Sequence, residues 1–516
     1  MKLCKFGIVP LIGAISAFLF SAAFPLLAVT ENAIDYTTFA IGETPCGVML
    51  SVYDGLESRG FSWQVTNSVE TTEVQLLKGS YGSADAATFA SEGRKLAAYI
   101  KTGNVGNLGM DRAANGYKAF VTGLEPGATY SYRIVATYDG GTREACAYGS
   151  FAVKTAKPET VTVVNINDVQ TKDGSKYYKA ANACAAAATA AGGADKIDFI
   201  LQGGDFFHMK GEKMTNVGVH SNSLNNTRWA MAAETVTPHF PAVPWVNVGG
   251  NHDDCAYVFV ASEAFALTNS PHAQGTTYVG GHSFTRGNVH FTTLPFNLMF
   301  DGKNYSADGM YEWLENDLKA SLADTNVRWR VVALHFGPYT TGDHAVSKNL
   351  GYTETEAASN LIVRLTPMFA ANRIDLVLQA HDHTYSKTVP YRWSGRGYTT
   401  SETDAAALNI APPTETDDGI TYDVDPKGTY YVSAGCVGHR VGENVNYAKV
   451  GTTSSYTHRN LKVATGKVKV TSSVSTVGDD ASKDTGKQMF GILKAAGDRL
   501  VYSFYIVPTD GVETSE

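Results

Sequence analysis

The chain is poor in cysteine and in cationic side chains, and it lacks the motifs of several common enzyme classes. Its 516 residues include six cysteines, none of them in the CxxC spacing of many zinc sites. No Walker loop, GxSxG nucleophile elbow or dinucleotide-binding glycine fingerprint occurs. Lys and Arg total 42 against 50 Asp and Glu, a net charge of -8, so a broad cationic surface for nucleic acid is disfavoured.

The few cysteines do not form a disulfide framework. Cys4 lies in the N-terminal apolar segment, and the remaining five are an odd number. Cys46 and Cys146 bracket the first strand-rich region, and two alternatives are open for them: they pair in an oxidising compartment, or they remain thiols. The other cysteines are expected to be small buried residues rather than zinc ligands.

Long apolar runs are absent after the N terminus. Residues 1–28 carry two lysines ahead of an apolar stretch rich in small residues, which predicts an export signal cleaved after Ala23 or Ala28. The alternative is an uncleaved anchor, because the run approaches the ~20 residues that span a bilayer. Prolines and small residues in the run favour cleavage. We therefore expect a secreted or periplasmic protein with no stable membrane span after signal cleavage.

Residues 30–156 consist of short alternating strands separated by turn residues. With 44% hydrophobic residues in the chain, this pattern predicts a β-sandwich domain. The stretch LEPGATYSYRI resembles the corner of fibronectin type III domains, in which Tyr130 or Tyr132 would tie a loop to the start of a strand. No catalytic residue is evident in this region.

After Pro158 the pattern changes to apolar strands that alternate with helices. This alternation predicts βαβ units and a layered α/β domain over residues 160–510, with β-sheets flanked by helices. Two polar stretches, near 401–426 and 444–488, are expected to be surface insertions. The helices are predicted at 176–191, 226–235, 311–322 and 357–372, and the strands at 161–168, 196–205, 243–254, 328–336 and 374–383.

Residues that can bind metals recur where these strands end. They are Asp168, Asp205, Asn251 with His252, His335, and His381 with His383. Taken singly, such an aspartate is more often a turn former or helix cap, and a lone histidine is more often a core residue. Because the carboxyl ends of the strands in an α/β sheet face a shared crevice, five such ends together favour a metal site.

Five motifs stand at these ends in a fixed order: Asp168, GGD at 203–205, GNHD at 250–253, LHFGPY at 334–339 and AHDHTYS at 380–386. This order resembles that of the calcineurin-like metallophosphoesterases. The preceding sandwich, with RGFSWQVTN at 59–67, makes the chain similar to the purple acid phosphatases and their bacterial relatives. The resemblance implies two metal ions of Fe, Zn or Mn: Asp205 bridges them, Asp168 and His383 bind the first, and Asn251, His335 and His381 bind the second.

The chain departs from both family patterns at the first metal. Gln170 stands where the general pattern has histidine, and His208 stands where the purple enzymes have a tyrosine. Two alternatives are open. Either His208 completes the first metal shell, with Gln170 nearby as a weak ligand or hydrogen-bond partner, or His208 faces solvent and the first ion is held weakly.

The resemblance implies an exported phosphatase that hydrolyses phosphomonoesters by attack of a metal-bound hydroxide. His252 would act as an acid or transition-state donor, and His344 would contact the small phosphoester substrate. A phosphodiesterase or nucleotide hydrolase on the same scaffold is the first alternative. The second is a secreted binding or adhesion protein with a decayed metal site.

Overall fold

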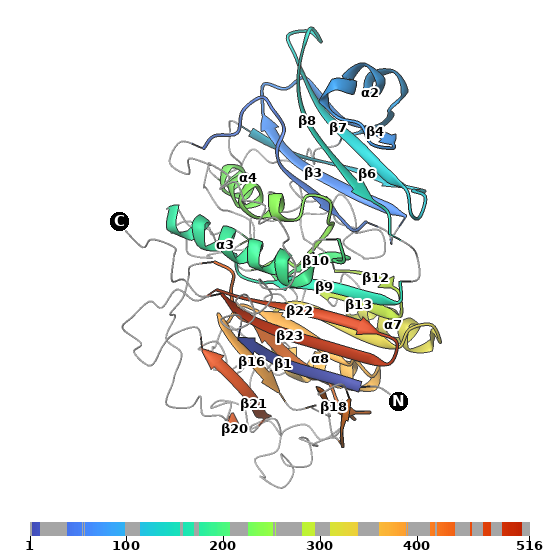
Figure 1. Ribbon diagram of the computed structural model, residues 1–516, viewed down its shortest axis with the longest axis vertical. Helices are drawn as coiled ribbons and strands as arrows, with labels where there is room; N and C mark the ends of the chain where they lie inside the picture. Colours follow the sequence, from blue (N-terminus) through green and yellow to red (C-terminus); the bar gives the residue numbers. More distant parts are fainter. Residues whose placement is uncertain are drawn as a thin grey trace, which may run out of the picture.

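The computed structural model is built of two packed units (Figure 1). The first, in blue and cyan, is strand-rich, and the second combines sheets with helices. The residues that the structure describes are 3–10, 39–53, 55, 57–98, 114–154, 158–169, 175–193, 195–206, 225–250, 253, 281–294, 310–338, 361–388, 390, 413–417, 420–438, 455–456, 468–475 and 488–507.

The first unit is a β-sandwich, as the alternating pattern predicted. Three strands form one layer in the order β2-β3-β6, and four form the other in the order β5-β4-β7-β8. Aromatic and branched side chains such as Phe61, Trp63, Ile134 and Phe151 are buried between the layers. The strands are β2 (Cys46–Ser51), β3 (Ser58–Thr66), β4 (Thr71–Lys78), β5 (Arg94–Ala97), β6 (Ala114–Thr122), β7 (Thr129–Tyr138) and β8 (Arg143–Ala152).

One corner of the sandwich is fixed by a tyrosine hydroxyl. The backbone N–H of Glu125 donates to the hydroxyl oxygen of Tyr130 at 3.1 Å, which ties the 124–128 loop to the start of β7. Tyr132 instead packs its ring against Phe61, with the centroids 5.3 Å apart. Of the two tyrosines predicted for this role, Tyr130 therefore holds the corner.

The cysteines of this unit are free thiols, so the disulfide alternative is wrong. Cys46 begins β2 and Cys146 lies on β8, in different layers of the sandwich. The sulfur of Cys146 accepts a hydrogen bond from Nε of Arg133 at 3.3 Å. Cys184 and Cys436, in the second unit, are buried as expected.

The second unit packs two sheets face to face, with apolar side chains of both in a shared core. Its first sheet contains β9 (Thr160–Ile166), β10 (Phe199–Gln202), β11 (Trp245–Asn247), β22 (Gln488–Ala496) and β23 (Arg499–Val507). The second contains β12 (His282–Arg286), β13 (Val289–Leu294), β14 (Trp329–Phe336), β15 (Leu376–Ala380), β16 (Thr384–Thr388), β19 (Tyr430–Ala434), β20 (Ser455–Tyr456) and β21 (Val468–Ser475).

Helices cover the second unit at the positions that the sequence predicted. Val164 and Ile166 of β9 point outward and pack with residues of two of these helices in a second core cluster, beside the junction with the sandwich. The four predicted helices are α3 (Ser175–Gly192), α4 (Asn225–Val236), α7 (Met310–Ala323) and α8 (Leu361–Ala371). Three short elements were not predicted: the helix α2 (Ala86–Glu92) and the 3-10 turns η1 (Ser83–Asp85) and η3 (Thr237–His239).

The two units share one sheet. Its strand order is β17-β18-β1-β23-β22-β9-β10-β11-β2-β3-β6, so β2 of the sandwich lies beside β11. The N–H of Val52 donates to the carbonyl of Trp245 at 3.0 Å, and β2 and β11 run parallel. The edge of the sandwich is therefore continuous with the strand that leads to the GNHD motif.

The polar insertions and the predicted export signal also contribute strands. β17 (Thr414–Asp417) and β18 (Ile420–Val424) form a hairpin in one insertion, and β21 in the other pairs with β16. β1 (Leu3–Pro10), within the predicted signal, runs parallel to β23. Among the described residues, no helix combines the length and apolar character needed to cross a membrane.

Candidate metal centre

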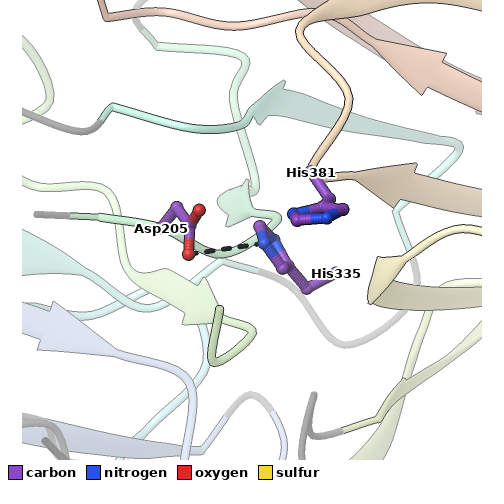
Figure 2. Close-up of side chains that lie close together, drawn as sticks. All are labelled: Asp205, His335 and His381. Atoms are coloured by element: carbon purple, nitrogen blue, oxygen red, sulfur yellow. Dashed lines mark ion pairs between the residues drawn. The ribbon is translucent and has the colours of Figure 1, made fainter. Parts of the chain in front are cut away.

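Three side chains from three separate strand ends converge in the second unit. Asp205 follows β10, His335 lies near the end of β14, and His381 follows β15. One ligand atom from each lies within 4.8 Å of the others, and Figure 2 shows the side chains turned toward one another. His335 Nε2 is 3.3 Å from Asp205 Oδ1. The strand ends thus gather the imidazole and carboxylate groups that the sequence pointed to.

A second pair lies directly beside this cluster. Asp168, two residues after β9, has its Oδ1 3.6 Å from Nε2 of His383. The backbone N–H of His381 donates to Oδ2 of Asp168 at 3.2 Å, and the N–H of Asp168 donates to the carbonyl of Gly204 at 3.0 Å. These bonds join the Asp168–His383 pair to the Asp205–His335–His381 cluster, so that two neighbouring groups of ligands result.

The backbone is strained at three of these positions. Asp168, Asp205 and His381 have φ values of 50°, 53° and 70°. Non-glycine residues seldom adopt this left-handed region, and such strain concentrates at functional sites. Here the strain aims each side chain away from the line of its strand and into the crevice.

Two glycines, which precede Asp205 and Asn251 in the chain, make room for the cluster. A Cβ on Gly204 would lie 2.2 Å from Nδ1 of His335, and a Cβ on Gly250 would lie 2.1 Å from Oδ1 of Asp205. Both distances are far below contact, so any other residue would displace a ligand.

Hydrogen bonds behind the ligands fix their orientation. Nδ1 of His335 lies 2.9 Å from the carbonyl of Gly203; since a carbonyl only accepts, Nδ1 carries a proton and Nε2 faces Asp205. Asp253 accepts the N–H groups of Phe206 and Gly250, each at 2.9 Å, and so joins the loops after β10 and β11. Asp253 was not predicted as a site residue, although it is the last letter of GNHD.

Both histidines that face a carboxylate hold protons firmly. Burial disfavours the charged form of His335, but Asp205, Asp168 and the Gly203 carbonyl outweigh it and raise its pKa to about 9. Burial likewise opposes charge on His383, while the sulfur of Cys436 and the carboxylate of Asp168 raise its pKa well above the usual value. The site therefore attracts positive charge, whether a proton or a metal ion.

The residues fit a metal ion by their chemistry. Asp168 is fully buried, and among the described residues its Oδ1 accepts no hydrogen bond. Burying a carboxylate oxygen that accepts no hydrogen bond costs free energy of folding unless a nearby cation offsets that cost. Carboxylate and imidazole together suit Zn, Fe and Mn. Asp205, His335 and His381 would hold one ion, and Asp168 with His383 would hold part of a second shell.

The remaining predicted residues lie outside the described part of the chain. These are His208, Gln170, Asn251, His252 and His344. Their roles, including the choice between His208 and a weakly held first ion, stay predictions.

Comparison with known proteins agrees with this geometry. The family model for calcineurin-like phosphoesterases matches residues 161–385, which contain β9 to β15 and all five ligands above. Residues 161–385 of the second unit form a calcineurin-like phosphoesterase domain. This domain begins at β9, which follows the sandwich along the chain.

Known relatives match this chain over part of their length. Two uncharacterized proteins of Mycobacterium tuberculosis are 27% identical over 164 residues, which is 29% of this chain and 28% of each relative. Purple acid phosphatase 18 of Arabidopsis thaliana is 25% identical over 166 residues, which is 31% of this chain and 35% of the relative. The matched stretch thus spans about a third or less of these proteins.

The fold extends over more of the chain than the sequence likeness does. Purple acid phosphatase PPD1 from yellow lupin seeds superposes with a TM-score of 0.56 at 12% identity, covering 92% of this chain and 74% of that structure. At this identity the likeness establishes the fold: a sandwich followed by a phosphoesterase domain.

Proposed function

We propose that the chain is an exported, binuclear metal-dependent phosphatase that hydrolyses phosphomonoesters. The observation that carries the proposal is the adjacency of two ligand groups, with Asp168 bonded to the backbone of His381 at 3.2 Å. Two ions in such neighbouring positions suit phosphoester chemistry, because paired cations clamp the attacking and leaving oxygens of an in-line displacement. When bound, the ions supply Lewis acidity and neutralise the charge of the phosphate.

The protein residues prepare the site for that charge. Asp205, in the loop after β10, is the carboxylate proposed to serve both ions. His335 presents Nε2 because Gly203 accepts the proton on Nδ1. The pKa of His335, raised to about 9, means that a metal ion must displace a proton there, so metal binding should release protons near neutral pH.

The other predicted residues complete the proposal. Asn251 would join His335 and His381 around the second ion, and His208 would join Asp168 and His383 around the first. His252 would donate a proton or hydrogen bond to the departing oxygen, and His344 would contact the phosphoester. The partner is thus a small phosphoester rather than nucleic acid, in keeping with the net charge of -8.

A substrate comparison tests this function. Purified metal-loaded protein should hydrolyse 4-nitrophenyl phosphate with a kcat/KM at least about tenfold above that for bis(4-nitrophenyl) phosphate, a difference of about 1.4 kcal/mol. Preference for the diester would replace the proposal with a phosphodiesterase. Turnover of neither ester, with less than one tightly bound ion per chain, would favour a binding protein with a decayed site.

The location is tested separately. Export predicts that the protein recovered outside the cytoplasm begins after Ala23 or Ala28, which mass spectrometry of the intact chain would detect. An intact N terminus in a membrane fraction would support the anchor instead.

A further inference from the structure

A chain of polar side chains crosses the apolar core beneath the metal centre. The hydroxyl of Tyr502 on β23 donates to Oδ1 of Asn165 on β9 at 2.8 Å. Nδ2 of Asn165 donates to Oδ1 of Asn167 at 2.9 Å, and Nδ2 of Asn167 donates to the backbone carbonyl of Gln379 on β15 at 3.3 Å. We call the side chains of Tyr502, Asn165 and Asn167 the inter-sheet strut, because they lead from one sheet to the other.

The strut occupies positions where the strand pattern calls for apolar residues. Val161 and Val163 of β9 point into the core between the sheets, and Asn165 follows them with the same period of two. Asn165, Asn167 and Tyr502 are at most 2% exposed. A buried amide in such a core is tolerated when its hydrogen bonds are made, and a fully connected chain of them rigidifies its surroundings.

The bonds of the strut run in one direction. Tyrosine hydroxyl, asparagine amide and asparagine amide each donate to the next member, ending on a carbonyl that can only accept. Aligned hydrogen bonds of this kind polarise one another and strengthen the chain. The orientation of both amides is thereby fixed, because reversing either one would place its Oδ1 against a backbone carbonyl, Leu201 for Asn165 and Gln379 for Asn167, so that two acceptors would face each other.

One end of the strut lies between two strands that carry predicted ligands. Asn167 immediately precedes Asp168, and Gln379 stands two residues before His381. Nδ2 of Asn165 also donates to the carbonyl of Leu201 on β10 at 3.2 Å, four residues before Asp205. The strut therefore touches all three strands whose ends supply Asp168, Asp205 and His381.

Two glycines leave the space that the strut needs. A Cβ on Gly491 of β22 would lie 1.9 Å from the Tyr502 hydroxyl, and a Cβ on Gly203 would lie 2.1 Å from Oδ1 of Asn167. Gly491 is the cross-strand neighbour of Asn165, so Tyr502 reaches Asn165 over the place where a side chain would stand. The packing on both sides of the strut is thus arranged around it.

We propose that Tyr502, Asn165 and Asn167 are positioning residues that set the spacing of Asp168 and Asp205 against His381 before a metal ion binds. The proposal rests on the metal requirement of the proposed function. A site assembled from two sheets must hold its ligands within a few tenths of an ångström, and residues behind a ligand typically change metal affinity by about 10- to 100-fold. The strut is a polar connection that reaches from one sheet to the other behind those ligands.

The test compares removal of a buried tyrosine hydroxyl from the strut with removal of one from the sandwich. Tyr502→Phe removes the first bond of the strut and keeps the ring in the core. Tyr138→Phe is the matched control: its hydroxyl, also on a buried tyrosine, donates to the carbonyl of Glu43 at 2.7 Å in the sandwich. Metal-stripped full-length protein is titrated with Zn²⁺ against a competing chelator, and thermal unfolding is followed in parallel.

We expect Tyr502→Phe to weaken Zn²⁺ binding about tenfold and Tyr138→Phe to leave it unchanged, while both lose similar thermal stability. Gly491→Ala, which intrudes on the Tyr502 hydroxyl without touching a ligand, should weaken Zn²⁺ binding in the same direction. If Tyr502→Phe is poorly folded, the Zn²⁺ titration of Gly491→Ala tests the proposal instead. Unchanged Zn²⁺ affinity in the folded variants would overturn the proposal.

The outcomes separate the strut from the function. If the wild-type chain binds Zn²⁺ but does not hydrolyse 4-nitrophenyl phosphate, the proposed phosphatase function is contradicted. The comparison of Zn²⁺ affinities between the variants is still valid in that case. A wild-type chain that hydrolyses the ester while the variants keep full Zn²⁺ affinity contradicts the strut alone. A wild-type chain that binds no Zn²⁺, Mn²⁺ or Fe²⁺ contradicts both.

Discussion

The two units of this chain have the same type of core, between two packed β-sheets, but they differ in the residues at one end of that core. Each packs two β-sheets face to face. In the sandwich, Phe61, Trp63 and Phe151 fill the space between the sheets, and the Tyr130 hydroxyl makes its bond at the corner. In the phosphoesterase domain, the core is apolar along β9 and β15 and then changes to amides, carboxylates and imidazoles where these strands end.

This difference shows which part of the chain is destabilised by its functional residues. Aromatic packing in the sandwich stabilises its fold directly, because apolar area leaves water. Asp168 and Asp205 are both fully buried at the other site, and a buried carboxylate costs free energy unless a cation compensates it. The phosphoesterase domain is therefore the part whose stability should depend on a bound ion.

The largest expected effect comes from the proposed bridging carboxylate. Asp205→Asn removes a negative charge between the two ligand groups, so we expect kcat/KM for an aryl phosphate to fall at least about 1,000-fold, or about 4 kcal/mol. Asp317→Asn is the control, since Asp317 is a largely buried carboxylate that accepts Ser283 and Thr292 hydroxyls away from the site. Full activity in Asp205→Asn, with a native circular dichroism spectrum, would remove the bridge from the mechanism.

Metal removal should come next and should affect the two units unequally. Ions at 100 to 1,000 times their Kd stabilise the folded state by roughly 3 to 4 kcal/mol, which chelation would abolish. Hydrogen exchange should then speed up in β10, β14 and β15 and stay constant in β3 and β7. Equal acceleration in both units would contradict the contrast between their cores.

A smaller effect is expected at the sandwich corner. Tyr130→Phe removes the hydrogen bond from the Glu125 N–H and should cost about 1 kcal/mol of unfolding free energy. Metal content and kcat/KM should not change, because the corner lies in the other unit. A loss of bound metal in this variant would mean that the sandwich acts on the site.

The smallest effect concerns the junction of the two units. Glu234 on α4 accepts the Gly47 N–H of β2 at 2.5 Å, and burial raises the pKa of its carboxyl above 4.5. A raised folded-state pKa of an acid gives stability that is greatest below pH 4.5 and declines as pH rises through the raised value. Glu234→Gln keeps the acceptor and removes the charge, so thermal unfolding should show a more stable variant at pH 7 and equality near pH 4. Identical pH profiles for variant and wild type would show that Glu234 is not titrating at the junction.

Much of this architecture was predictable from local patterns. The apolar run VTVVNIND predicted β9, the alanine-rich stretch predicted α3, and five polar strand ends predicted the site. Local pattern failed at α2, a seven-residue helix within a strand-rich region, where the element is too short to show a helical period. It also left Cys46 and Cys146 open as a disulfide, although they lie in different layers of the sandwich.

By itself, the sequence determined the two fold classes, the order of the motifs and the residue types at the strand ends, because these depend on periodicity and on neighbours along the chain. Tertiary structure alone decided which ligands meet. Asp168 and His383 are 215 positions apart in the chain, and only the packing of two sheets brings them to 3.6 Å. It also decided that β2 of the sandwich extends the sheet of the second unit, and that Asn165 and Tyr502 form a strut beneath the site. Such contacts depend on how surfaces from distant segments pack against each other, and no local pattern along the chain encodes that distance.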